Sequence, residues 1–480
     1  MSTRKNTLYN VGYRVFSVLL PLVTAPYLSR AVGQEGVGLY AYAWNINYIF
    51  WLIGLLGLEN YGTRAIAQAR DDRKRLEETF SEIWVMQLLV AGVTLLAYVV
   101  YLLAVAGEEK PIALALLPII VSCLFNLDWT LMGLDQFKPI ALRNTAVKLL
   151  AAACVFLFVR EKGDLWIYGL AWGAATFLGC LSCAFSLRGR VRFRHVALRA
   201  ALRHLKPCSL LALSVIAVSV YRIMDRVMVG AIAGMAQNGL YENAEKIVYC
   251  LSGFISAIGT VMLPKVTALY RQGRQEAARD HMDKSMQLVL CMVCAMAFGV
   301  ASIAGRLCPL FYGADFQASA PLLIPLGFTL VMIGFANVIR TQWILPREKD
   351  RIVVRSVLSG ALVNVLVNAL LIPRLLAAGA VVGTLCAELA VPLVQWFFLR
   401  KELPYRRYLG YLLQYAGIGL AMLLSVRLAD SLLPGVTWLR LGAQVFLGAA
   451  VYGAGCLILW KLTRKQWIFG LIRRKKASVK

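Results

Sequence analysis

Long runs of hydrophobic residues recur along the whole chain, and short polar segments separate them. Each run holds about 20 residues, which is the length that an α-helix needs to cross the hydrocarbon core of a bilayer. We place about fourteen such segments, the first over residues 9–30 and the last over 436–460. A closed barrel would instead show short segments of alternating hydrophobicity. The pattern therefore predicts an all-α polytopic membrane protein.

Composition agrees with this interpretation. Hydrophobic residues make up 60% of the 480 residues and charged residues only 16%, whereas about a quarter of an average soluble domain is charged. The first hydrophobic run carries Arg14, Pro21 and Pro26, and no small-residue cleavage site follows a compact apolar core, as a signal peptide would require. We expect this run to stay in the membrane as the first span.

The formal net charge is +26, which in a soluble protein would suggest a nucleic-acid partner. Here most of the 51 Lys and Arg residues fall in loops on the inner side of the membrane when the N-terminus is placed inside. Basic residues mark the cytoplasmic side of membrane proteins. We therefore expect both termini in the cytoplasm and no nucleic-acid partner. The basic linker 188–206 has the pattern of an amphipathic helix on the inner membrane surface.

Cysteine and histidine residues give little support for metal or redox chemistry. The eleven cysteines lie almost entirely inside hydrophobic runs, where cysteine behaves as a small apolar residue. His195, His204 and His281 lie in basic loops without the neighbours that a metal site needs. We expect no metal site and no cofactor.

An internal repeat relates two parts of the chain. The stretch GVGLYAYAWNI (36–46) aligns with QNGLYENAEKI (237–247), an offset of 237 − 36 = 201 residues. Six predicted spans separate the copies, so both copies cross the membrane in the same direction. Parallel repeats of this kind occur in secondary transporters that work by alternating access.

The repeat predicts two pseudo-symmetric six-helix lobes, followed by two additional spans. The predicted parts are an N-terminal lobe (1–187), the basic linker (188–206), a C-terminal lobe (207–400), the two additional spans (401–463) and a basic cytoplasmic tail (464–480).

Charged residues inside the predicted spans are the first candidates for function. A charge at the bilayer centre is costly, so such residues usually face a cavity or a partner. Arg222, Asp225 and Arg226 share one face of the seventh span because three and four residues separate them, and Arg14 lies on the first span, its symmetry mate. Arginine suits phosphate because its planar group donates two hydrogen bonds at once. We interpret Arg222, Arg226 and Arg14 as candidates for substrate binding.

Acidic residues in the spans form a second set. Glu242 lies on the eighth span at a depth similar to that of Arg226 on the seventh, so a salt bridge across the intervening turn is one interpretation of this pair. Glu388, near the middle of a later span, is open to ion coupling, to pairing with an arginine, or to a structural role. The candidates for ion coupling or charge pairing are Asp225, Glu242, Glu245, Lys246 and Glu388.

Four stretches of the chain resemble the Wzx-type oligosaccharide flippases. They are LYNVGYRVFSVLLPLVTAPYLSRAVGQEGVGLYAYAWNI, LMGLDQFKPIALRNTAVKLL, DRVMVGAIAGMAQNGLYENAEKI and ALLIPRLLAAGAVVGTLCAE. These flippases belong to the superfamily that also holds MurJ and the MATE drug exporters. The resemblance covers nearly the whole chain, in order and with similar loop lengths.

The resemblance implies a MATE/MurJ-like fold and a non-enzymatic flippase of the bacterial inner membrane. It would turn undecaprenyl-pyrophosphate-linked repeat units from the inner to the outer leaflet for O-antigen, capsule or exopolysaccharide synthesis. Implied partners are this lipid-linked oligosaccharide, membrane lipids, a proton or sodium counter-ion, and the polymerase and chain-length regulator of the same pathway. The arginine–aspartate pair typical of the first span in MurJ-like proteins is missing, which argues against lipid II as the substrate.

Two other functions stay open at this point. A MATE-type multidrug exporter would share the fold, but its cavity would more often be dominated by carboxylates that suit cationic drugs. A polysaccharide polymerase would need a sizeable outer loop, and every loop that we place outside is short. No acid–base pair or metal cluster stands out in those loops.

Overall fold

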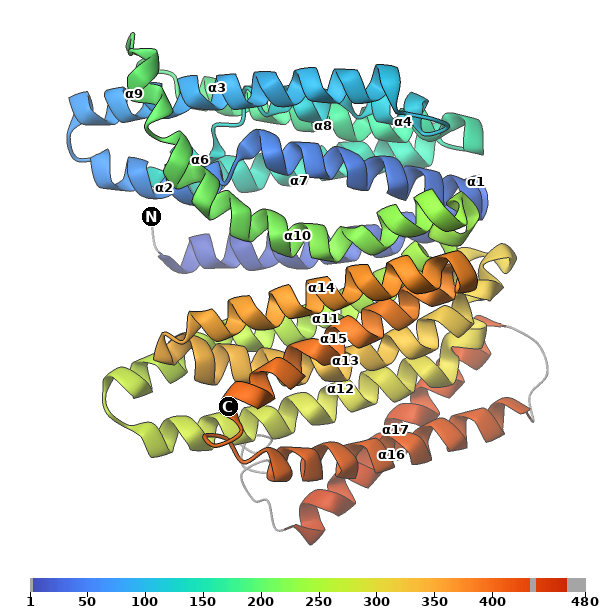
Figure 1. Ribbon diagram of the computed structural model, residues 1–480. Coiled ribbons are helices and arrows are strands. Elements are labelled where there is room, and N and C mark those ends of the chain that lie inside the picture. Colours follow the sequence, from blue (N-terminus) through green and yellow to red (C-terminus); the bar gives the residue numbers. More distant parts are fainter. Residues whose placement is uncertain (1–2, 432–436, 464–480) are drawn as a thin grey trace. The chain divides into compact units, whose positions relative to one another are not determined.

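The computed structural model describes residues 3–431 and 437–463, and the regular elements in these ranges are all helices (Figure 1). The side chains of residues 3–19, 21–22, 213–218 and 220–222 lie outside the description. The all-α architecture predicted from the hydrophobic pattern is confirmed.

The helices follow one another without strands in the described ranges. They are α1 (Thr3–Leu55), α2 (Leu58–Ala69), α3 (Arg73–Ala104), α4 (Lys110–Ala115), α5 (Leu117–Ser122), α6 (Asp128–Gly133), α7 (Phe137–Phe158), α8 (Leu165–Ser186), α9 (Leu198–Leu202), α10 (Leu205–Ala233), α11 (Met235–Arg271), α12 (Gln275–Tyr312), α13 (Ala320–Ile339), α14 (Asp350–Leu375), α15 (Ala377–Leu399), α16 (Tyr405–Ser431) and α17 (Trp438–Leu462). In the part of the chain that the structure describes, eleven helical segments are long and apolar enough to cross a membrane. The chain is therefore a multi-pass membrane protein.

Two of the predicted spans lie in the single element α1. Gly33 interrupts its helical backbone with φ 67° and ψ −175°, a conformation that glycine adopts readily and other residues avoid. Its mate in the repeat, Gly234, has φ 91° and ψ 166° and separates α10 from α11. The two copies of the repeat thus turn at equivalent glycines.

The predicted span over residues 112–133 is divided into the short helices α4, α5 and α6. Pro118 occupies the first turn of α5, where the missing N–H of proline costs nothing. Within a continuous helix the same residue would remove a backbone hydrogen bond and collide with the preceding turn. The division therefore follows from the sequence.

The chain folds into two compact units. Unit 1 comprises residues 1–242 with 368–380, and unit 2 comprises 243–367 with 381–480. Helix α10 and the start of α11 belong to unit 1, where α10 packs along α1. The lobe limits predicted from the repeat stay a prediction.

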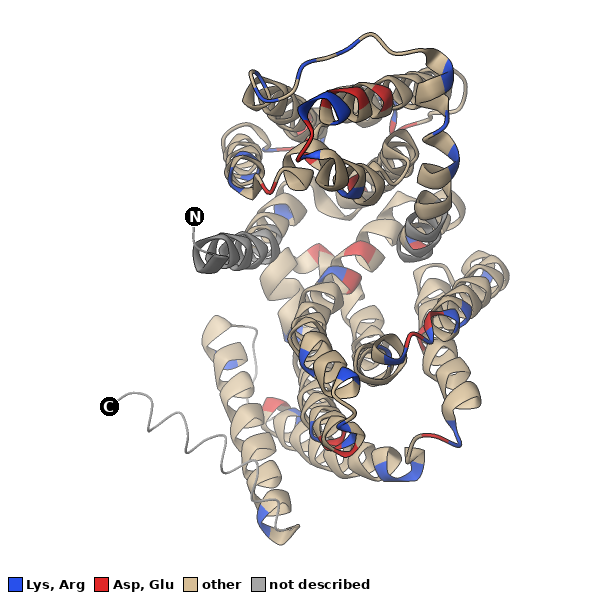
Figure 2. Ribbon diagram, turned by 90° about the vertical axis from the view of Figure 1, so that its left-hand side faces the viewer, with Lys and Arg blue, Asp and Glu red and all other residues tan. Residues whose placement is uncertain are grey.

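The linker between α8 and α10 is held against α3 at one end of unit 1. The backbone N–H of Arg194 donates to the Ser81 hydroxyl over 2.8 Å, and the Arg194 side chain pairs with Glu77. Within 188–206 the chain is helical over α9 and at residues 205–206, where α10 begins, and not over the whole range as its amphipathic pattern suggested. Figure 2 shows basic residues along this loop and at nearby helix ends.

Candidate functional site

The two copies of the repeat cross each other inside unit 1. A Cβ atom added at Gly38 on α1 would collide with the carbonyl oxygen of Met235 on α11, and one added at Gly239 would collide with that of Gln34. Asn238 also donates its side-chain amide to the carbonyl oxygen of Gly38 over 2.9 Å. Glycine at both positions therefore lets the two helices approach until their backbones touch.

A buried carboxylate lies on α10 close in sequence to this crossing. Asp225 is 4% exposed, and one carboxylate oxygen accepts a 2.9 Å hydrogen bond from the Tyr241 hydroxyl of α11. The other oxygen accepts a very short hydrogen bond from the Asn368 side-chain amide of α14. Three helices thus converge on one acidic side chain, which satisfies much of its need for hydrogen bonds.

The neighbouring residue on α10 forms an ion pair with α11. Nε of Arg226 lies 2.6 Å from Oε2 of Glu242, and the two side chains are 18% and 13% exposed. This is the salt bridge across the turn that the sequence allowed. A pair that is mostly removed from solvent is sensitive to loss of either partner, because the remaining charge stays buried.

The other predicted site residues divide into two groups. The side chains of Arg222 on α10 and Arg14 on α1 lie outside the described residues, so their roles stay predictions. Glu245, Lys246 and Glu388 belong to unit 2 and are half-buried. Their roles in charge pairing also stay predictions.

The sequence did not identify Tyr241 and Asn368 as partners of Asp225. Tyr241 is the repeat mate of Tyr40, and this match is the one sequence signal that would have drawn attention to it. Asn368 lies 143 residues from Asp225 in the chain, and an asparagine in a long hydrophobic run gives no hint of its partner.

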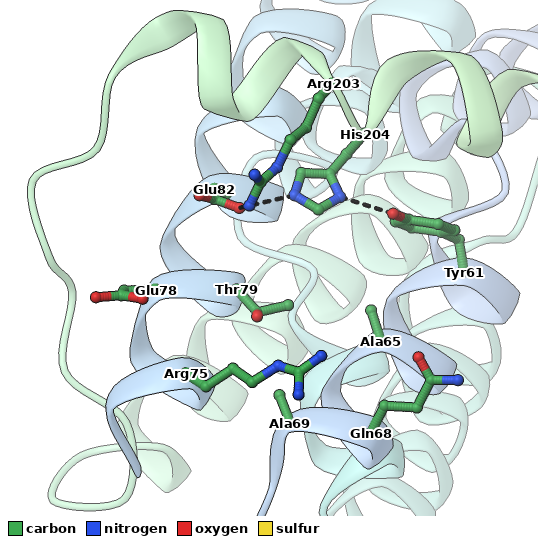
Figure 3. Close-up of a pocket in the computed structure, with 10 residues that line it drawn as sticks. All are labelled: Tyr61, Ala65, Gln68, Ala69, Arg75, Glu78, Thr79, Glu82, Arg203 and His204. Carbon is green, nitrogen blue, oxygen red and sulfur yellow. Dashed lines mark hydrogen bonds and ion pairs between the residues drawn. The ribbon is translucent and has the colours of Figure 1, made fainter. Parts of the chain in front are cut away.

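A pocket of about 450 Å³ lies between α2, α3 and the start of α10 (Figure 3). His204 is buried in its wall, with Nδ1 2.7 Å from the Tyr61 hydroxyl and Nε2 2.9 Å from Oε2 of Glu82. Arg203 pairs with the same glutamate oxygen. Arg75 lies across the pocket from this chain of contacts (Figure 3). The network fastens the end of the linker to α2 and α3.

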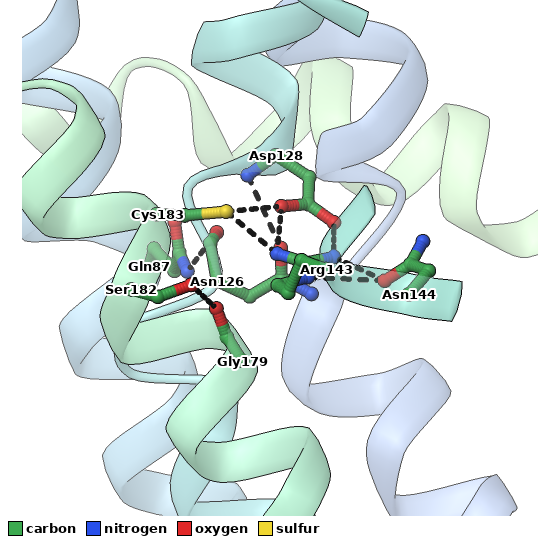
Figure 4. A network of polar contacts seen from close by, with 8 residues as sticks. All are labelled: Gln87, Asn126, Asp128, Arg143, Asn144, Gly179, Ser182 and Cys183. Carbon is green, nitrogen blue, oxygen red and sulfur yellow. Dashed lines mark hydrogen bonds and ion pairs between the residues drawn. The ribbon is translucent and has the colours of Figure 1, made fainter. Parts of the chain in front are cut away.

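Another ion pair joins α6 and α7 (Figure 4). Both guanidinium nitrogens of Arg143 lie 2.6 Å from the two carboxylate oxygens of Asp128. Sγ of Cys183 on α8 lies 3.4 Å from Asp128. The two-point contact between Arg143 and Asp128 joins α6 to α7, and Cys183 adds α8 to the cluster. This geometry is typical of a structural ion pair. No group of three or more His, Cys, Asp and Glu residues that could hold a metal ion is present in the described ranges.

Comparison with known proteins shows the family of the chain and several similar proteins. A family model described as "Polysaccharide biosynthesis protein" matches residues 3–269, more than half of the chain. Over 406 residues the chain is 22% identical to a protein of Escherichia coli (strain K12) that carries the provisional name O-antigen transporter, covering 84% of this chain and 98% of that relative.

Two solved structures share the fold. A lipid II flippase MurJ in an inward closed conformation has a TM-score of 0.79 at 16% identity, over 95% of this chain and 99% of that one. An inward-facing multidrug transporter of the MATE family has a TM-score of 0.62 at 15% identity, over 86% of this chain and 96% of that one. The MATE/MurJ-like fold and the resemblance to flippases of this superfamily, both expected from the sequence, are confirmed.

Proposed function

We propose that this chain, which belongs to the polysaccharide biosynthesis protein family, turns lipid-linked oligosaccharide over in the membrane and catalyses no bond change. Its relative of nearly equal extent is named as a transporter, and the lipid II flippase MurJ shares its fold. The substrate is an undecaprenyl-pyrophosphate-linked repeat unit. It moves from the inner to the outer leaflet of the bacterial cytoplasmic membrane for O-antigen, capsule or exopolysaccharide synthesis.

The observation that carries this proposal is the charged group beside the helix crossing. Asp225, Arg226 and Glu242 lie in apolar helices. The hydrogen bonds from Tyr241 and Asn368 to Asp225, and the ion pair between Arg226 and Glu242, make these three charges tolerable there. A sugar pyrophosphate cannot cross hydrocarbon unaided, because its hydroxyls and charges would lose water without replacement partners. In this proposal, polar side chains of the protein replace the lost water. The helices that carry them change position so that the head group is exposed first to one side of the membrane and then to the other, which is alternating access.

The basic residues of the site bind the anionic head in this proposal. Arg226 and Arg222 lie one helical turn apart on α10, and Arg14 lies on the symmetry-related first span. An inside-negative membrane potential assists outward movement of negative charge by about 2.3 kcal/mol per charge per 100 mV. Glu245, Lys246 and Glu388 serve as charge-pairing residues.

Asp225 is the coupling residue in this account. A proton or sodium ion that binds its carboxylate neutralises the charge that Tyr241 and Asn368 now stabilise. The hydrogen bonds that draw α11 and α14 toward α10 then weaken. A ligand shifts a conformational equilibrium by its difference in affinity for the two states. A proton or sodium ion would bind more weakly to the state in which Tyr241 and Asn368 stabilise the Asp225 carboxylate than to a state without these contacts.

Depletion of the protein in its native cell tests the proposal. Lipid-linked sugars are quantified by mass spectrometry, and their leaflet is determined with a reagent that cannot enter the cell. We expect complete repeat units to accumulate on the cytoplasmic leaflet. Single units stranded on the outer leaflet would point to a polymerase, and unchanged lipids with new sensitivity to cationic drugs would point to an exporter.

A further inference from the structure

Six aromatic side chains lie on two neighbouring helices of unit 1. Tyr40, Trp44, Tyr48 and Trp51 follow one face of α1 because spacings of three and four residues bring them together. Tyr168 and Trp172 on α8 lie beside the first two. We call these six residues the aromatic ladder.

Ring contacts divide the ladder into two groups, one of four rings shared between α1 and α8 and one pair further along α1. Tyr40 stacks on Tyr168 with centroids 4.3 Å apart and planes at 26°, and Trp44 meets the edge of Trp172 at 5.9 Å. Along α1, Tyr40 stacks on Trp44 at 6.1 Å. Further along, Tyr48 stacks on Trp51 at 5.5 Å.

The ladder differs from the aromatic core of unit 1. All six side chains are only half-buried, whereas Tyr98 and Trp129 in the core of unit 1 are at most 2% exposed. Trp51 packs against the core cluster that contains Tyr98, so core packing accounts for this ring. The other five rings each keep part of their surface accessible.

The ladder also differs from the interfacial belts of membrane proteins. Such a belt lies at the level of the lipid headgroups. From Tyr40 to Trp51 the helix rises by about 16 Å at 1.5 Å per residue, which is more than half of a hydrocarbon core of about 30 Å. By comparison, exposed positions on the membrane-spanning helix α3 carry aliphatic side chains, such as Leu96 and Leu103, which suit contact with lipid.

One end of the ladder meets the charged site. Tyr40 lies two residues after Gly38 on α1, and Glu242 lies three residues after Gly239 on α11, so the contact between these two glycines brings both residues to the same part of unit 1. Glu242 in turn pairs with Arg226. The molecule thus joins a charged group to a row of half-exposed rings with polar edges.

We propose that the aromatic ladder is the surface on which the sugar rings of the substrate stack while its pyrophosphate lies near Arg226. This rests on the proposed function and deepens it. One face of a pyranose ring carries C–H groups with a slight positive charge, and these suit the negative face of an aromatic ring. Tyrosine hydroxyls and indole N–H groups at the ring edges match the sugar hydroxyls. Stacking tolerates different sugars, because most pyranoses present such a face.

The proposal is tested with purified full-length protein in liposomes. Two probes are used: lipid-linked repeat units extracted from depleted cells, and undecaprenyl pyrophosphate carrying one hexose. Periodate added outside reports how fast each sugar reaches the outer leaflet. The test variant is Trp44→Leu, which removes the aromatic face and keeps an apolar side chain. Trp166→Leu is the matched control, because Trp166 is a 47% exposed tryptophan of α8 outside the ladder.

We expect Trp44→Leu to slow movement of the full repeat unit by about 2- to 12-fold, the factor that one aromatic contact provides, and to slow the single-sugar lipid less. Trp44→Phe should restore most of the rate, and Trp166→Leu should match the unmodified protein. If Trp44→Leu slowed both probes equally, or slowed neither, the proposed role of the aromatic ladder would be wrong, but the proposed function would stand. If the unmodified protein moves neither probe, the proposed function fails and the ladder fails with it. Thermal unfolding of each variant shows whether it is folded.

Discussion

At the scale of single residues, Asp225 is a carboxylate that is 4% exposed in an apolar helix of unit 1. A buried carboxylate is stable only when hydrogen-bond donors replace its water, and Tyr241 and Asn368 do so from two other helices. Its position in a hydrophobic run was enough to predict a special role from the sequence. The sequence could not identify Tyr241 and Asn368 as its partners, because these contacts form only when helices that are distant in the chain pack together.

Replacement of Asp225 by asparagine keeps the shape of the side chain and removes its charge. We expect export of polysaccharide to fall by about 5- to 150-fold, the range that 1–3 kcal/mol of lost coupling gives, while the protein still inserts. Complementation of depleted cells, with membrane protein measured in parallel, provides the readout. Asp71→Asn is the control, because the Asp71 side chain is 98% exposed. Unchanged export in Asp225→Asn would remove this residue from the coupling step.

Arg222 is predicted to contact the anionic head, as its place one turn before Arg226 suggests. We expect Arg222→Ala to insert normally and to lose transport, because the substitution removes a positive charge that binds the anionic head. Arg222→Lys should be partly active, since lysine keeps the charge but loses the two-point contact with phosphate. Export in depleted cells separates the two variants, and full activity of Arg222→Ala would exclude the residue from the site.

At the scale of elements, the crossing of α1 and α11 explains the strongest part of the repeat. The sequence predicts the match of Gly38 with Gly239 but gives no reason for it. In the structure, both glycines lie where two backbones touch, and each faces a carbonyl oxygen of the other copy. Sequence alone could not show this, because the contact joins segments about 200 residues apart.

Alanine at Gly38 should force the two helices apart. Overpacking of a close contact costs about 1–3 kcal/mol, and here the colliding atom is backbone that cannot rotate away. We expect Gly38→Ala to lower the unfolding temperature of the purified protein. Gly92→Ala on α3 should leave it equal or slightly higher, because a Cβ atom there meets open space and alanine favours helix. Similar unfolding temperatures for both variants would contradict the close crossing.

A polar cluster in unit 2 fastens the loop between α15 and α16. Glu402 accepts hydrogen bonds from Lys349 over 2.6 Å and from the Trp343 indole over 3.0 Å. The Arg347 guanidinium lies 3.6 Å from the centroid of a Trp343 ring and 3.3 Å from the same carboxylate. Burial alone would raise the pKa of Glu402, but hydrogen bonds and charge from these donors outweigh it and hold the pKa below its usual value.

Because the folded pKa of Glu402 is lowered, its carboxylate stabilises the protein above the unfolded pKa, and this contribution is lost as pH falls through the folded value. We expect Glu402→Gln to reduce stability by about 1 kcal/mol at neutral pH, a modest figure because solvent screens these partly exposed groups. The difference should shrink in acid. Thermal unfolding across pH checks this, with Glu348→Gln, exposed in a nearby loop, as control. A difference that stays constant to low pH would contradict the assignment.

At the scale of the whole molecule, the sequence predicts the membrane architecture well, since runs of about 20 apolar residues leave few alternatives. Interruptions by Gly33 and Pro118 follow from residue chemistry. The division into two compact units was harder to predict from the sequence, because it depends on which helices pack together. The proposed function draws on both levels, because the chain belongs to a polysaccharide biosynthesis family and the charges in its apolar helices suit a polar head group.

The most direct test of this account is to reconstitute the purified protein into sealed liposomes that contain lipid-linked repeat units from its native cell. Periodate added outside reacts only with sugars of the outer leaflet. The account predicts that the protein raises the reactive fraction from about half to nearly all of the sugar, and that Asp225→Asn slows this rise. A reactive fraction that stays near half, in liposomes that contain folded protein, would contradict the assignment as a flippase.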